Sequence, residues 1–107
     1  MTIIAEIGTS IGRTTNDGPK ITRTYRLGQY TVRVRVARDS YMTQSYAVAE
    51  VLTPALTWTN LCEQPPENFF EHAPTHGPKA AASQELLLKL ADDLARRGAR
   101  ILRVPTE

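Results

Sequence analysis

The chain has 107 residues, enough for one domain that buries roughly two-thirds of the surface its unfolded form exposes. Its 41% hydrophobic and 22% charged residues exclude wholesale disorder. No apolar run approaches the ~20 residues that span a bilayer, and the N-terminal residues lack the basic leader of a secretory signal. The single cysteine, Cys62, excludes an internal disulfide. We therefore expect a cytoplasmic protein with no membrane partner.

The net charge of +2 is unevenly distributed along the chain. Residues 1–40 contain seven Lys and Arg against three Asp and Glu, whereas residues 41–77 contain four Glu and no Lys or Arg. Such an asymmetry indicates either a polyanionic partner, such as DNA or RNA, or two oppositely charged faces that attract each other in a homodimer.

At the N-terminus we expect a first strand over 2–7 and then a loop over 8–19, which is rich in Gly, Thr, Asn, Asp and Pro. This loop contains a G-x-S-x-G pattern around Ser10, the pattern of a hydrolase nucleophile elbow. The elbow requires a helix directly after the serine, and turn-forming residues follow here instead. We therefore interpret the pattern as a glycine-bracketed turn.

The segment 30–36 is the clearest strand in the chain. Apolar residues alternate along it with Thr and Arg, so one face is apolar and the other is cationic. A preceding strand over 21–27 joins it through a two-residue Gly-Gln turn. Pairing Leu27 with Tyr30 brings the apolar sides of both strands together, and Arg23 is then the one charged residue on the apolar face.

The segment 41–53 is compatible with a helix or a strand. Apolar residues at helical spacing after Asp39, a candidate N-cap, favour a helix. A strand is favoured if the chain turns at 38–40, in three residues, and again at 53–55. The large apolar residues at even-numbered positions then lie on the same side of the sheet as the valines of 30–36. We favour strands, with these residues inside: Tyr46, Val48, Leu52, Leu56, Trp58 and Cys62.

Residues 49–58, running on to Pro65, resemble the outer hairpin of a kelch blade. The resemblance covers under a fifth of the chain, whereas a propeller needs at least four blades of about 50 residues. It therefore implies a hairpin and favours a strand at 41–52.

Residues 63–77 contain three prolines and no strand pattern, so we expect a loop there. A C-terminal helix is predicted over 78–98, with Gly98 as its left-handed stop, followed by a short strand over 100–104. The apolar stripe is Leu86, Leu87, Leu90 and Leu94, and the predicted ion pairs include Asp92–Arg96 and Asp93–Arg97.

The whole chain is thus predicted to be one α+β domain, 1–107, with an antiparallel four- to five-stranded meander in residues 1–62 packed on one long C-terminal helix. This order of elements resembles that of the coactivator proteins that bind single-stranded DNA. The resemblance is one of topology, without a shared sequence motif.

Cys62, His72 and His76 are spaced like part of a metal site. Pro74 lies between the two histidines and prevents the helical geometry that makes their spacing useful, and no fourth ligand is evident. The two adjacent aspartates of the predicted helix diverge around its axis and have arginine partners. We therefore expect no catalytic residues, no metal and no cofactor, and a protein that is not an enzyme.

The cationic sheet face is the main functional candidate, because guanidinium groups contact phosphates and threonine hydroxyls add neutral donors. Single-strand binders also use aromatic side chains on such a face. The predicted register instead directs the aromatic residues of the strands to the core: Tyr25, Tyr30, Tyr46 and Trp58. We expect a homodimer with either function. The alternative is a protein-interaction module that forms this homodimer through an edge strand and docks through Phe69 and Phe70, with no affinity for nucleic acid. The candidate nucleic-acid contacts are Arg23, Arg26, Arg33, Arg35 and Arg38.

Overall fold

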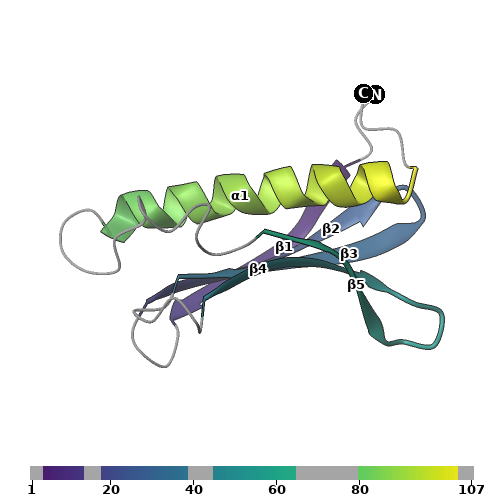
Figure 1. The fold of residues 1–107 in the computed structure, drawn as a ribbon, viewed down its shortest axis with the longest axis horizontal. Helices are drawn as coiled ribbons and strands as arrows, with labels where there is room; N and C mark the ends of the chain where they lie inside the picture. The colour runs from purple at the N-terminus through teal and green to yellow at the C-terminus, as the bar shows by residue number, and fades with distance from the viewer. Residues whose placement is uncertain (1–3, 14–17, 39–44, 65–79, 104–107) are drawn as a thin grey trace.

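The computed structural model describes residues 4–13, 18–38, 45–64 and 80–103. Five antiparallel strands form one sheet in the order β1-β2-β3-β4-β5, and one long helix lies across one face of it (Figure 1). The predicted α+β meander with a C-terminal helix is therefore confirmed. The elements are β1 Ile4–Arg13, β2 Pro19–Leu27, β3 Tyr30–Ala37, β4 Tyr46–Leu52, β5 Trp58–Glu63 and α1 Ala80–Ile101. We call the sheet face that α1 covers the inner face, and the opposite one the outer face.

The β2–β3 hairpin has the predicted register, with Leu27 opposite Tyr30 and Tyr25 opposite Val32. Gly28 has a φ of 62°, a left-handed conformation that glycine adopts without steric cost from a Cβ. The three valines of β3 are fully buried on the inner face. The intervening arginines consequently lie on the outer face, as the alternation predicted.

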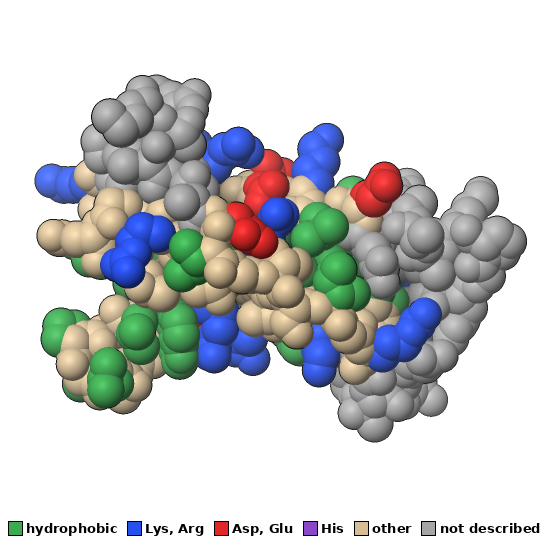
Figure 2. Space-filling model, turned by 180° about the vertical axis from the view of Figure 1, so that it is seen from behind, with side chains coloured by type: hydrophobic (Ala, Val, Ile, Leu, Met, Phe, Trp, Pro, Cys, Tyr) green, Lys and Arg blue, Asp and Glu red, His purple; other side chains and the backbone are tan. Residues whose placement is uncertain are grey.

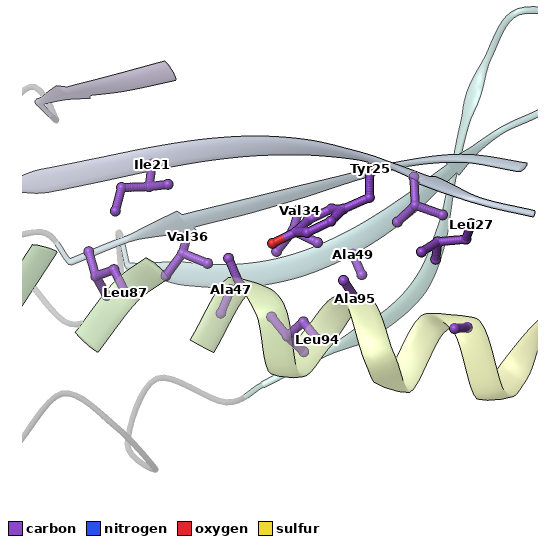
Figure 3. Close-up of a cluster of buried hydrophobic side chains, with 13 residues drawn as sticks. Ile21, Tyr25, Leu27, Val34, Val36, Ala47, Ala49, Leu87, Leu94 and Ala95 are labelled. Carbon is purple, nitrogen blue, oxygen red and sulfur yellow. The ribbon is translucent and has the colours of Figure 1, made fainter. Parts of the chain in front are cut away.

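The core lies between the inner face and α1. Figure 3 shows side chains of β2, β3 and β4 directed toward the helix, among them Tyr25, Val34 and Ala49. Removing this apolar surface from water contributes roughly 25 cal/mol per Å² and is the main term that holds the helix on the sheet. The fully buried helix residues are Leu87, Ala91, Leu94, Ala95 and Ala99.

The predicted helix stripe is only partly right. Leu87 and Leu94 are fully buried and Leu90 packs partly against the core, whereas Leu86 does not belong to the core cluster. Alanines occupy the remaining inner positions of α1. These small side chains let the helix lie close to the sheet.

The strand prediction for 41–52 is confirmed for 46–52, but β4 presents the opposite face from the one expected. Val34 pairs with Ala49, so every second residue starting at Ala47 lies on the inner face. The predicted three-residue turn at 38–40 is wrong, because Ala37 pairs with Tyr46 and the connection is longer. Close to α1 there is room for alanine, and the larger side chains lie outside: Tyr46, Val48 and Leu52.

β1 extends through the segment for which we predicted a loop. It pairs with β2 as far as Arg13 opposite Pro19, with a β-bulge at Ile7. The G-x-S-x-G pattern therefore lies inside a strand, and the turn expected there is wrong. Space does not require glycine at Gly8, where a Cβ would meet nothing within 4 Å.

The β4–β5 hairpin has a longer turn than predicted. Leu52 pairs with Trp58, so five residues connect the strands. The Thr53 amide donates to the Thr57 carbonyl at 2.8 Å and closes the turn. Leu56, expected beside Leu52, instead lies in the turn with a φ of 63° and 79% exposure.

The helix continues past its predicted stop, so the strand expected over 100–104 is wrong for its described residues. Gly98 is buried inside α1, and a Cβ on it would lie 3.1 Å from Leu61 Cδ1. The missing side chain at Gly98 thus lets α1 lie close to β5, and Gly98 does not end the helix. The left-handed residue is Arg103, with a φ of 59°. Among the described residues, no helix combines the length and the apolarity needed to cross a bilayer.

Candidate functional site on the outer sheet face

Two arginines of β3 and one glutamate of β4 form the centre of the outer face. Arg33 Nη2 lies 3.0 Å from Glu50 Oε1, and Arg35 Nε lies 2.8 Å from the same oxygen. Arg35 Nη2 also donates to Glu50 Oε2 at 3.2 Å. Two guanidinium groups thus share one carboxylate, and the cluster retains one net positive charge.

The carboxylate of this cluster is well enclosed, whereas the arginines stay within reach of solvent. The Glu50 side chain is 13% exposed, against 28% for Arg33 and 39% for Arg35. Burial by itself raises the pKa of Glu50, but the hydrogen bonds and charges of Arg35 and Arg33 outweigh it, so its pKa lies below the ordinary value. Glu50 is therefore ionised at neutral pH.

Aromatic rings lie on the same face as the arginines. The guanidinium carbon of Arg33 is 4.2 Å from the centroid of the Trp58 ring, and that of Arg35 is 5.5 Å from the Tyr46 ring. Both distances are within the range of cation–π attraction. The expectation that Tyr46 and Trp58 point to the core is therefore wrong, whereas Tyr25 is buried on the inner face as predicted.

The β2 side of the outer face adds hydroxyls and one exposed cation. Thr24 lies opposite Arg33, Thr22 opposite Arg35, and the exposed Arg26 opposite Thr31. Figure 2 shows Lys and Arg side chains both on the α1 side and on the side of the sheet away from α1, and hydrophobic side chains on the protruding β4–β5 hairpin. The outer face thus combines guanidinium groups, hydroxyls and aromatic rings.

Of the five arginines singled out from the sequence, three share the outer face: Arg26, Arg33 and Arg35. Arg23 lies on the inner face, where its Nη1 is 3.2 Å from Asp92 Oδ1 and its Nε is 3.7 Å from Glu6 Oε1. Arg38 follows the end of β3, where its amide donates to the Pro19 carbonyl at 3.0 Å.

A second polar cluster joins α1 to the inner face. The Tyr25 hydroxyl donates to Asp92 Oδ1 at 2.6 Å, next to Arg23. Burial, and then the hydrogen bond to Asp92, raise the pKa of Tyr25 far above its ordinary value. We predicted that Asp92 pairs with Arg96 along the helix. Its carboxylate instead contacts Tyr25 and Arg23 of the sheet, which gives this cluster a structural role.

The surroundings of Cys62 disfavour its reactive thiolate form. It is half-buried, its Sγ lies 3.8 Å from the Leu94 carbonyl oxygen, and burial raises its pKa against a smaller opposing effect of Arg97. No group of three or more His, Cys, Asp or Glu side chains in the described part of the chain is placed to hold a metal. His72, His76, Phe69 and Phe70 lie outside the described residues.

A pocket of about 410 Å³ opens at one end of the sheet. It lies between the β2–β3 turn and the start of the β4–β5 turn. Its walls come from both hairpins: Gln29, Tyr30, Thr31, Leu52, Thr53 and Pro54.

The fold defines an α+β protein with one open antiparallel sheet, and the site defines a cationic and aromatic surface on that sheet. Comparisons of the chain with protein-family models, with curated proteins and with solved structures found no match. The function is therefore inferred from the chemistry of the outer face.

Proposed function

We propose that this protein binds single-stranded nucleic acid through its outer sheet face, as a binding protein without catalytic activity. The observation that carries the proposal is that Arg33 and Arg35 share one face with Trp58 and Tyr46. Proteins that bind single strands without sequence preference combine a cationic track for the backbone with flat groups on which bases stack. Both components lie on this face.

The arrangement suggests a division of labour between the side chains. Arg26, which is exposed, and the partly exposed β3 arginines attract phosphates, and neighbouring threonine hydroxyls donate hydrogen bonds to them. A base can stack on the guanidinium plane of Arg33, which the Trp58 ring supports from the other side. The carboxylate of Glu50 keeps the two guanidinium groups in place.

A salt titration of oligonucleotide binding tests the proposal. Wild-type protein should bind a fluorescent single strand more tightly than a duplex of equal length. With three phosphate contacts, the logarithm of the affinity should fall with the logarithm of salt with a slope of about −2. No binding of either form at low salt would contradict the proposal.

Matched variants locate the binding face. The triple variant Arg33→Gln, Arg35→Gln, Glu50→Gln removes the ion-pair cluster without leaving an unpaired buried carboxylate, and it lowers the net charge by one unit. Arg100→Gln on exposed helix surface lowers the net charge by the same unit. The triple variant should lose at least about tenfold in affinity, because hydrogen bonds to charged groups contribute about 1.5–3 kcal/mol each. Equal affinities of the two variants would exclude the outer face.

An assembly function is the second candidate, favoured by the exposed isoleucines of β1. Ile7 is 56% and Ile11 is 53% exposed, and β1 is an edge strand with backbone groups available for pairing. Two copies joined through β1 would form a continuous sheet. Light scattering tests this: Ile11→Lys should convert a dimer to a monomer, and a monomeric wild-type protein would exclude it.

A further inference from the structure

Two residues that line the pocket at the end of the sheet pair across the strands with Arg26 and Trp58 of the outer face. Thr31, one of its walls, is opposite Arg26, and Leu52, another wall, is opposite Trp58. An exposed cation thus flanks the pocket on one side. On the other side lies the ring of Trp58, which contacts the guanidinium group of Arg33.

The walls of the pocket are chemically mixed in the way that a heteroaromatic ring requires. The half-buried ring of Tyr30, with Leu52 and Pro54, supplies apolar surface. Gln29 can donate and accept hydrogen bonds through one amide. The Thr53 hydroxyl is held in position by the Thr57 hydroxyl at 2.8 Å and the Thr57 amide at 3.3 Å.

The size and charge of the surroundings narrow the ligand class. A volume of about 410 Å³ lies near the lower end of the range for small-molecule pockets, which suits one ring system rather than an extended ligand. The wall residues contribute no charged side chain, whereas the neighbouring Arg26 is positive. A neutral ring attached to an anionic backbone matches this distribution.

We propose that this pocket accepts one unstacked nucleobase of a bound single strand, while Arg26 contacts an adjacent phosphate. The inference rests on the proposed function and adds to it a defined base subsite. Base contacts at this subsite distinguish the protein from a surface that only follows the phosphate backbone.

The test compares oligothymidylate with an abasic deoxyribose-phosphate strand of the same length and charge. Wild-type protein should bind the base-bearing strand more tightly, by roughly fivefold to 100-fold. Thr31→Phe, which fills the pocket, and Gln29→Ala, at an exposed turn position, should each reduce that preference without changing the salt slope. Thr59→Phe is the matched control, because Thr59 is exposed on β5 outside the pocket.

The outcomes separate the two proposals. If wild-type protein binds both strands equally with a steep salt dependence, the pocket proposal and the stacking of bases on Arg33 are both overturned, and only backbone binding by the outer face stands. If the base preference survives in both pocket variants and disappears in Trp58→Ala, the base stacks beside Arg33 and the pocket proposal is again overturned. If neither strand binds, both proposals fail.

Discussion

The guanidinium carbon of Arg33 lies 4.2 Å from the centroid of the Trp58 ring, although β4 separates the strands that carry them. At the same time Arg33 Nε donates to Glu50 Oε1 at 3.1 Å. The guanidinium group is therefore held at its edge by a carboxylate and over its face by a ring. This double contact fixes a cation on the outer face without burying it.

Replacing Trp58 should separate stacking from charge. Trp58→Ala should lower the affinity for single strands by roughly fivefold to 100-fold with an unchanged salt slope, because no charge is removed. Trp58→Phe, which keeps a ring, should retain most of the affinity. Trp58 is the only tryptophan in the chain, so its fluorescence should also change on binding. A reduced salt slope in Trp58→Ala would show that the ring acts only by positioning Arg33.

The ion pairs of Glu50 predict a pH dependence of stability. Its pKa in the folded protein is lower than the ordinary 4.5, so the unfolded chain binds the proton first as the pH falls. The stabilisation is thus present above about pH 4.5 and is lost as the pH falls through the lowered pKa. Glu50→Gln should be about 1–2 kcal/mol less stable at pH 7 and lose less stability between about pH 5 and 3. Urea denaturation at several pH values measures both, and parallel pH profiles would contradict this assignment.

The hydrogen bond between Tyr25 and Asp92 should contribute to holding α1 on the sheet. Tyr25→Phe should lower the free energy of unfolding by about 1–2 kcal/mol. Tyr46→Phe on the outer face serves as the control. Because the pKa of Tyr25 is raised in the folded state, wild-type stability should fall as the pH rises above about 10, the ordinary value. Tyr25→Phe should lose less over that range, and equal losses in chemical denaturation would refute the contact.

The contact of Gly98 with Leu61 should appear as a limit on side-chain size. Gly98→Ala gains about 1 kcal/mol in helix propensity, and its Cβ would crowd the half-buried Leu61 at 3.1 Å. These effects should nearly cancel in thermal unfolding. Gly98→Leu should lose about 1–3 kcal/mol by overpacking, since leucine is itself a good helix former. Adding Leu61→Ala should recover part of that loss. Equal stability of Gly98→Leu and wild type would show that α1 does not approach β5 this closely.

The accuracy of the sequence predictions followed the strength of each local pattern. The alternation in 21–36 is regular, and a two-residue turn fixes its register, so the β2–β3 pairing was predicted residue by residue. In β4, by contrast, apolar residues occupy both parities. Its facing therefore depended on the length of the connection after Ala37, and an assumed three-residue turn gave the wrong side.

Because the facing of β4 was predicted wrongly, the residues that β4 and β5 contribute to the candidate site were missed. The arginines of β3 were identified from their alternation, whereas Tyr46, Glu50 and Trp58 join them only through strand pairing. Gly98 shows the same limitation: a glycine near the end of a helical pattern indicates a stop, and nothing local reveals that Leu61 lies against it.

Periodicity alone determined that this chain forms a meander with a cationic β3 and an amphipathic C-terminal helix. Apolar side chains leave water only if they recur on one face, which requires alternation in a strand and helical spacing in a helix. The tertiary structure decided which face of β4 and β5 meets the helix. The physical reason is space: small residues on α1 bring the helix close to Ala47 and Ala49, so the bulky rings lie on the opposite face, beside the arginines.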